Sequence, residues 1–247
     1  MHTPLPTNGN DPFDEKEEMR GVTGNALLDT LPPHSRRLAK ALVDLPAGME
    51  LVRQGEQITQ TFFPTTAVCA IAVELASGDK TETAVVGNEG FLGVPLLLGM
   101  PVSNATKTVQ VPGQGYVLSA KHLIELCRQH EPFRRALFGY SAFRLHLASR
   151  SLACNTFHTI PQRLARWLLF THDRAGKDDF HLTHQTLSEI LGVTRPRVSE
   201  AAAKFKVMGV IGYRGGTVRI LDRRGLEELS CECYDETKAV FGRSDVH

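Results

Sequence analysis

The 247-residue sequence predicts an α+β fold in which a β jelly roll is followed by a long helix and a winged helix-turn-helix. Three patterns predict it. Short β-rich runs separated by turn residues occupy residues 45–119, and a long helical pattern covers 132–154, although Arg144 and Ser151 interrupt its apolar seam. Two short helical patterns and a hairpin pattern then follow within residues 182–222.

Residues 1–20 contain few large apolar side chains. They are rich in proline, asparagine, glycine and acidic residues, so we expect them to form a disordered arm. A helix is expected from about Asn25. It should be interrupted at Pro32 and Pro33 and resume through Leu38, Ala41 and Leu42.

The β-rich region has turn residues at near-regular intervals, which is typical of a sandwich or jelly roll. Its main apolar runs cover residues 68–75, 83–86 and 106–111. Residues 90–99 stand apart, because they are too apolar for a surface loop and too rich in glycine and proline for a central strand. They form either a short helix between strands or a cradle that binds an anionic ligand through backbone N–H groups near Gly90 and Gly93.

The helical stretch that starts near Pro132 carries apolar residues at spacings of three, four and seven. These residues are Phe133, Leu137, Tyr140 and Leu147. A helix of this length would extend about 33 Å, which is longer than a small core needs. We therefore expect these four residues to pair with a second copy of the chain, with a hinge near Asn155.

The region from Leu182 onwards has the signals of two helices joined by a tight turn. Thr183 is expected to cap the first helix, and Gly192 to end it in the left-handed conformation. Thr194 and Pro196 mark the start of the second helix. The apolar positions of the two helices are Leu187, Ile190, Leu191, Val198, Ala202 and Phe205.

The second helix is expected to present polar side chains to solvent, namely Arg195, Arg197, Ser199, Glu200 and Lys204. Apolar residues on both sides of Gly215 and Gly216 predict a hairpin, or wing, after it. Two helices with outward arginines and a wing indicate a DNA-binding module. A pair of packed helices on an enzyme surface is the alternative structural interpretation.

Charge favours the DNA-binding interpretation. Residues 160–224 contain twelve Lys or Arg and six Asp or Glu, a balance of +6. The rest of the chain carries −5, and the whole chain has a net charge of +1. A basic end on an acidic body is expected when one domain alone meets phosphate.

Composition excludes several classes of protein. No apolar run approaches the roughly 20 residues that span a bilayer, and no signal peptide is apparent, so we expect a cytoplasmic protein. The five dispersed cysteines favour reduced thiols. For Cys231 and Cys233, with Cys154 and His247 as conceivable partners, helix packing is preferred to a metal site. No catalytic motif indicates an enzyme, and no cofactor can be named.

Several short motifs resemble those of one branch of the Crp/Fnr superfamily of bacterial transcription regulators. They are Phe63-Pro64-Thr65, Val85-Val86-Gly87-Asn88-Glu89-Gly90, Leu191-Gly192-Val193-Thr194-Arg195 and Cys231-Glu232-Cys233-Tyr234. The resemblance implies a homodimeric, effector-responsive transcription factor. Its parts would be the arm 1–20, a cyclic-nucleotide-binding-like sensor domain 21–131, a dimerisation helix and hinge 132–156, a winged helix-turn-helix 157–235 and a tail 236–247.

The chain also departs from well-known members of that superfamily. Val94 stands where a ribose-binding Glu is expected, and residues 102–106 lack the phosphate-binding Arg. We therefore do not expect cyclic AMP to bind in the usual way. The N-terminal arm has no cysteines for an iron–sulfur cluster. Glu200 replaces a base-reading Arg and suits cytosine N4, while Arg195 should contact guanine or a phosphate.

The resemblance and the patterns together give candidate sites and partners. Predicted DNA contacts are Thr183, His184, Gln185, Thr194, Arg195, Arg197, Ser199, Glu200, Lys204 and Arg214. Candidate effector contacts are Asn88, Glu89, Gly90, Gly93, Arg144 and Ser149. Expected partners are a palindromic DNA duplex, a second copy of the chain, an unidentified small-molecule effector and RNA polymerase. The alternatives are a ligand-sensing module whose helix-turn-helix binds protein, and, more remotely, an enzyme.

Overall fold

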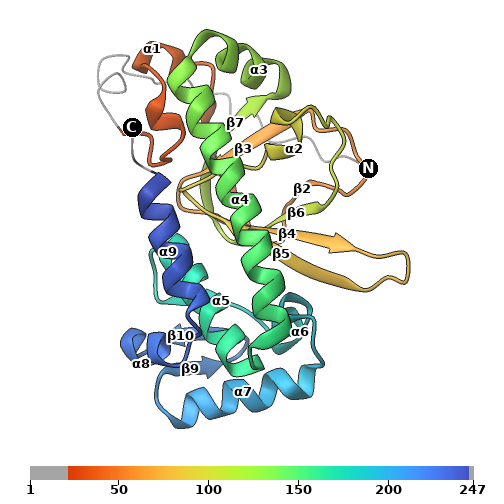
Figure 1. The fold of residues 1–247 in the computed structure, drawn as a ribbon, viewed down its shortest axis with the longest axis vertical. Coiled ribbons are helices and arrows are strands. Elements are labelled where there is room, and N and C mark those ends of the chain that lie inside the picture. The colour runs from red at the N-terminus through yellow and green to blue at the C-terminus, as the bar shows by residue number, and fades with distance from the viewer. Residues whose placement is uncertain (1–21, 245–247) are drawn as a thin grey trace.

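The computed structural model describes residues 22–244, so the expected disordered arm lies outside the described residues. A β jelly roll forms the upper half of the molecule in Figure 1, and the C-terminal domain forms the lower half. One long helix, α4 (Glu131–Phe157), runs along both. The predicted fold class is confirmed. Among residues 22–244, no helix is long and apolar enough to cross a membrane.

The jelly roll consists of two facing antiparallel sheets. The first has the strand order β1-β7-β3, and the second has the order β2-β6-β4-β5. The strands are β1 (Lys40–Leu45), β2 (Glu50–Val52), β3 (Gln60–Pro64), β4 (Val68–Glu74), β5 (Lys80–Val86), β6 (Thr106–Val111) and β7 (Gly113–Ser119). Their inward side chains share one apolar core with α4, including Phe63, Phe91, Leu118 and Phe133.

The prediction of a helix through Leu38, Ala41 and Leu42 is wrong. Only a 3-10 turn, η2 (Leu28–Thr30), and a single helical turn, α1 (Pro33–Arg36), form there. Residues from Lys40 onwards form β1, which pairs antiparallel with β7. Tertiary pairing with a strand some 70 residues away overrides the local helical pattern, as often happens in short apolar segments.

Residues 90–99 contain a short helix, α2 (Val94–Leu97). The backbone of Leu92 donates a hydrogen bond to the carbonyl of Phe62 at 2.8 Å, which ties this segment to β3. The structure therefore agrees with the first of the two alternatives, a helix between strands.

The long helix is present, but the face that we expected to pair with a second copy packs inside the chain's own core. α3 (Ala120–Gln129) precedes α4, which extends to Phe157, past the hinge expected at Asn155. The chain instead leaves the helix at His158 and Thr159. The prediction of the dimer interface is wrong. Its four residues are only 0 to 8% exposed and belong to the chain's own core, namely Phe133, Leu137, Tyr140 and Leu147.

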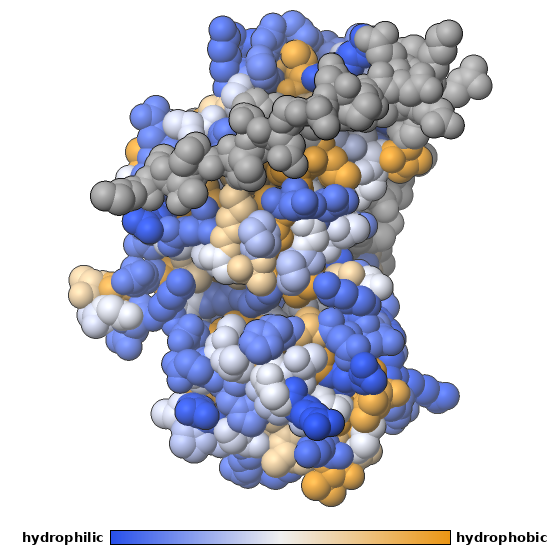
Figure 2. Space-filling view, turned by 180° about the vertical axis from the view of Figure 1, so that it is seen from behind, coloured by the Kyte–Doolittle hydropathy of each residue, from blue (hydrophilic) through white to orange (hydrophobic). Residues whose placement is uncertain are grey.

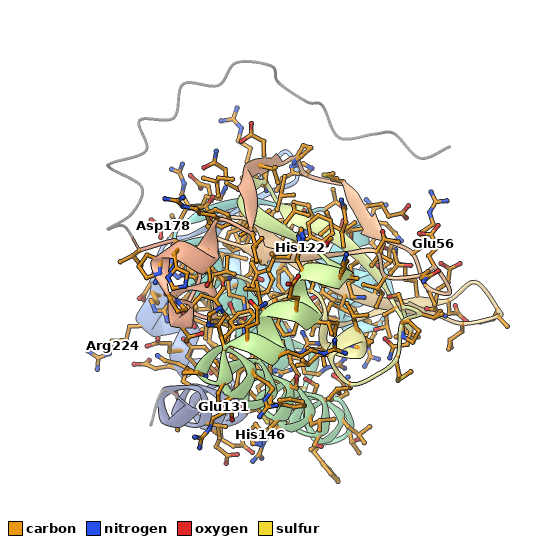
Figure 3. The ribbon with its side chains drawn as sticks, turned by 90° about the horizontal axis from the view of Figure 1, so that it is seen from above. Glu56, His122, Glu131, His146, Asp178 and Arg224 are labelled. Carbon is orange, nitrogen blue, oxygen red and sulfur yellow. The ribbon has the colours of Figure 1, made fainter. Side chains whose placement is uncertain are left out.

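The C-terminal domain has the predicted winged helix-turn-helix. Its elements are α5 (Ile160–Ala175), β8 (Asp179–His181), α6 (His184–Leu191), α7 (Arg195–Val207), β9 (Ile211–Arg214), β10 (Thr217–Ile220), α8 (Arg223–Glu228) and α9 (Cys233–Ser244). The wing has the order β8-β10-β9, so the sequence analysis missed one short strand. Residues 236–244 of the expected tail continue α9, which lies beside α4 (Figures 1 and 3), and the rest of that tail lies outside the described residues.

Candidate nucleic-acid interface and its link to the jelly roll

The turn between α6 and α7 is built as the sequence predicts. The hydroxyl of Thr183 accepts a hydrogen bond from the Thr186 backbone N–H at 3.1 Å. Gly192 has φ of +60°, a conformation that residues with a Cβ rarely adopt, and it ends α6. Pro196 lies in the first turn of α7. Thr194 occupies the N-cap position, although its side chain makes no capping hydrogen bond.

The outer face of α7 is exposed at the lower end of the molecule (Figure 1). This helix packs on α5, α6 and β9, while the jelly roll lies beyond α5 and α6. The side chains of Arg195 and Arg197 are exposed, and they make no hydrogen bond or ion pair with any of residues 22–244. Two unpaired guanidinium groups at the start of an exposed helix are available to phosphates or base edges.

Further along α7, Glu200 and Lys204 pair with each other at 2.8 Å. The hydrogen bond from Lys204 holds the pKa of Glu200 below its usual value. Both side chains are well exposed, and exposed pairs of this kind contribute little free energy. The pair can therefore separate when another partner, such as an exocyclic amine or a phosphate, approaches.

His184 and Ser199 are less accessible than predicted. The Ser199 hydroxyl and His184 Nδ1 are 2.8 Å apart, and the His184 ring packs against Tyr213 with centroids 4.4 Å apart. Burial lowers the pKa of His184, and the charge of Arg195 lowers it further. These contacts hold α6, α7 and the wing together. Of the candidates at the start of α6, Gln185 is the exposed one.

The wing tip presents Arg214, which is exposed. Gly215 and Gly216 both have positive φ, at +60° and +79°, and form the turn of the hairpin. At the base of the wing, Arg219 of β10 pairs with Asp179 of β8 through two hydrogen bonds of 2.5 and 2.7 Å. Seen from behind, the lower half of the molecule is mostly hydrophilic (Figure 2). The DNA contacts themselves stay predictions.

A buried ion pair links the C-terminal domain to the jelly roll. Arg174 of α5 donates to Glu89 at 2.7 Å, and both side chains are only 9% exposed. The other oxygen of Glu89 accepts the Gly87 backbone N–H at 3.0 Å. A Cβ at Gly87 would lie 2.7 Å from the Arg174 side chain, so only glycine leaves room for the pair. This accounts for Gly87 and Glu89 in the motif.

The two glycines proposed as an anion cradle serve close packing instead. A Cβ at Gly90 would lie 2.2 Å from the Tyr140 ring, and one at Gly93 would lie 2.7 Å from Phe91. The Gly90 N–H is already bonded to the Gly87 carbonyl at 3.2 Å. Of the other candidate effector contacts, Asn88 and Ser149 are exposed on the surface. The structure does not bring the six candidates together into one cradle.

A second polar contact connects the C-terminal domain to the jelly roll. The indole N–H of Trp167 donates to Glu82 of β5 at 2.7 Å, and Gln110 of β6 donates to the other oxygen at 2.8 Å. Burial raises the pKa of Glu82 to about 7, against the effect of these two hydrogen bonds. Because α6 also packs on β5, the first helix of the helix-turn-helix rests directly on the jelly roll.

A buried lysine of the jelly roll and a half-buried arginine of α4 lie near each other, and neither has an acidic partner among the described residues. Lys107 is 3% exposed, and its ammonium donates to the Ser103 hydroxyl at 2.7 Å. Burial lowers the pKa of Lys107 to about 8, and the charge of Arg144 on α4 lowers it further. Nε and Nη1 of Arg144 are buried with no hydrogen-bond partner in residues 22–244. Sequence reasoning found Arg144 and missed Lys107, because a lysine in a strand is usually solvated.

Comparison with known proteins agrees with this geometry. Residues 162–229 match the model of the Crp-like helix-turn-helix domain. The CRP-like cAMP-activated global transcriptional regulator of Mycobacterium tuberculosis is 23% identical over 193 residues, which are 74% of this chain and 85% of that protein. The chain thus aligns with this regulator well beyond the helix-turn-helix domain.

Solved structures share the whole fold. FixK2 from Bradyrhizobium japonicum superposes with a TM-score of 0.65 at 18% identity, covering 77% of this chain and 97% of that one. The c-di-GMP responsive global regulator CLP of Xanthomonas campestris gives 0.61 at 16% identity, covering 76% and 97%. Residues 162–229 thus form a Crp-like helix-turn-helix domain, and with the jelly roll and the long helix the chain has the fold of regulators of the Crp/Fnr type.

Proposed function

We propose that the protein acts as a homodimer on an imperfect palindrome and is controlled by an anionic effector that binds at the jelly roll. The observation that carries the dimer is an exposed apolar stripe along α4. Phe138, Leu145 and Leu152 are 47, 67 and 71% exposed. They lie seven residues apart, the spacing with which one helix packs against its twin.

The stripe replaces the dimer face expected from sequence. Large apolar side chains in a regular row on the outside of a helix are unusual unless a partner covers them. A two-fold axis along α4 would place two copies of α7 on the same side of the dimer. Their arginine-bearing ends would then enter successive major grooves, roughly 34 Å apart.

Dimerisation also has an energetic reason. A module that makes a few phosphate contacts binds non-specifically at about 10⁻⁴ to 10⁻⁶ M, whereas specific complexes typically reach about 10⁻⁸ M or tighter. Two modules on one palindrome double the phosphate contacts and add base readout. The balance of +6 in residues 160–224 supplies the charge for those contacts.

The double substitution Leu145→Glu/Leu152→Glu is expected to convert the dimer into a monomer, because it places charges in the centre of the stripe. Sedimentation velocity at micromolar concentration measures the change. The control is Leu75→Glu, at a 60% exposed leucine outside α4, which should leave the dimer intact. A wild-type monomer, or a dimer that survives the double substitution, would refute the stripe as the interface.

The effector part of the proposal rests on Lys107 and Arg144. A buried cation without a partner is costly, and an anion between these two groups would relieve that cost. The two relatives described above are, by their names, cAMP-activated and c-di-GMP responsive, and both of those effectors carry phosphates. Here the phosphate would be bound by Lys107 and Arg144, since Val94 and residues 102–106 lack the usual groups.

Calorimetry with a panel of phosphate-containing metabolites tests the effector site. For any compound that binds the wild type, Arg144→Met should weaken affinity by about tenfold or more, since charge-assisted hydrogen bonds contribute about 1.5–3 kcal/mol. Lys121→Met, at an exposed lysine of α3, should have no effect. Binding that is insensitive to both Arg144→Met and Lys107→Met would place the effector elsewhere.

A protein-interaction module is the alternative. It would show a shallow dependence of nucleic-acid binding on salt, whereas a DNA-binding module loses affinity steeply as salt rises. The unpaired Arg195 and Arg197 and the basic C-terminal domain favour DNA.

A further inference from the structure

Three cysteines and one histidine from distant parts of the chain converge at the end of α4. Cys154 is in the last turn of this helix, and His158 immediately follows it. Cys231 and Cys233 lie at the start of α9, where Cys233 is the first helical residue. The three Sγ atoms and a ring nitrogen of His158 all lie within 4.8 Å of one another.

The distances suit a single tetrahedral ion. The Sγ atoms of Cys154 and Cys231 are 3.6 Å apart, and Sγ of Cys233 is 3.6 Å from His158 Nδ1. With Zn–S bonds of about 2.3 Å, tetrahedral geometry puts neighbouring sulfurs about 3.8 Å apart. An iron–sulfur cluster would divide the four ligands between two or four irons and hold the ligands of different irons further apart than the 4.8 Å within which all four atoms lie here. The observed spacing therefore favours one ion.

The histidine is oriented as a metal ligand would be. Its Nδ1 faces the sulfurs, and its Nε2 lies 3.2 Å from a carboxylate oxygen of Glu232. Histidines that bind zinc commonly donate their other ring N–H to a carboxylate, which fixes the ring and the tautomer. This arrangement gives the Cys-Glu-Cys spacing a reason, because the two cysteines turn inward while the exposed Glu232 between them reaches His158.

Charge at the cluster agrees with an anionic complex. Three thiolates, a neutral histidine and Zn²⁺ carry a net charge of −1. Arg166 of α5 lies nearby, and its Nε and Nη1 atoms are buried without a hydrogen-bond partner among the described residues. The charge of Arg166 acts on the Cys154 sulfur, which places the guanidinium close to the cluster. A buried, under-satisfied guanidinium beside sulfur atoms is where a metal–thiolate complex would be stabilised.

We propose that Cys154, His158, Cys231 and Cys233 bind one zinc ion. The expectation that Cys231 and Cys233 serve helix packing alone is thereby replaced, and His158, which the sequence analysis did not consider, supplies the fourth ligand. All four protein ligands fill the coordination sphere, which is typical of a structural site without an open position for catalysis.

The position of the site indicates which parts of the fold the ion would link. His158 lies where the chain leaves α4 and enters the C-terminal domain, and α9 packs against α4. An ion bound there would tie α9 to this junction and so restrict how the C-terminal domain can move relative to α4. This role does not depend on the effector or on the dimer.

The full-length protein, purified under reducing conditions without chelator, is expected to contain about one zinc per chain by elemental analysis. Cobalt provides the second readout. Co²⁺ added to the zinc-free protein should give the thiolate charge-transfer and tetrahedral ligand-field absorption bands, and Zn²⁺ should abolish them.

Three variants test the ligands. Cys233→Ser should abolish stoichiometric zinc, whereas Cys127→Ser, at a buried cysteine outside the cluster, should retain it. Glu232→Gln keeps all four ligands and should weaken zinc binding by about 10- to 100-fold. Absence of zinc together with absence of the cobalt bands in the reduced, folded wild type would overturn the proposal. A Cys154–Cys231 disulfide in freshly isolated protein would also overturn it.

Discussion

Replacing Arg195 and Arg197 together with alanine is expected to weaken binding to a selected palindromic site by about a hundredfold or more. Each arginine that reaches a guanine edge contributes about 1–3 kcal/mol of discrimination, and a dimer loses four such side chains. Those that contact phosphate add a further, sequence-independent loss. Fluorescence anisotropy with labelled duplexes at several salt concentrations measures both effects.

Arg224→Ala is the matched control for the single α7 variant Arg195→Ala, because each removes one positive charge from the same domain. Arg224 points away from the molecule (Figure 3), and its one ion pair among the described residues is with Glu228 of its own helix, at 3.5 Å. It should change affinity far less than the substitutions in α7. Equal losses from Arg224→Ala and from the α7 variant would mean that net charge alone drives binding. The assignment of α7 to the groove would then be wrong.

Arg174→Ala is expected to lower the free energy of unfolding by about 3–5 kcal/mol. It leaves the Glu89 carboxylate buried and without its counter-ion, which costs more than an ion pair contributes. Trp167, the single tryptophan, lies at the boundary between the two domains. Denaturant titration monitored by its fluorescence therefore measures the loss of stability there. The double variant Glu89→Gln/Arg174→Met removes both charges and should recover much of the stability.

Arg219→Ala provides the comparison for an exposed ion pair. Arg219 and its partner Asp179 are 61% and 45% exposed at the side chain, so the substitution should change the free energy of unfolding very little. If Arg174→Ala costs no more than Arg219→Ala, the buried pair is not what holds the two domains together. The close fit of Gly87 against Arg174 would then need another explanation.

The contacts between the domains suggest how the jelly roll acts on the helix-turn-helix. The Glu89–Arg174 and Glu82–Trp167 pairs both connect the jelly roll to α5, while Arg144 and Tyr140 belong to α4. An anion that recruits Arg144 would shift α4, against which α9 also packs. Such a shift changes the balance between two arrangements of the C-terminal domain only if the anion binds them with different affinity.

Local sequence by itself determined the helix-turn-helix. A capping threonine, a left-handed glycine and a proline in the first turn act over a few residues, so Thr183, Gly192 and Pro196 predict their elements without help from the rest of the chain. The turn residues of the jelly roll and of the wing act in the same way. The outward row on α7 followed directly from helical spacing.

Tertiary structure alone decided which face of α4 is buried, what the glycine-rich motif does and where the cysteines meet. Helical spacing gives α4 two apolar rows, and only contact with the jelly roll shows that Phe133 and Leu137 are internal while Leu145 is exposed. Glu89 meets Arg174 across 85 residues, and Cys154 meets Cys231 across 77. Such pairings depend on how the whole chain closes on itself, and no local pattern carries that information.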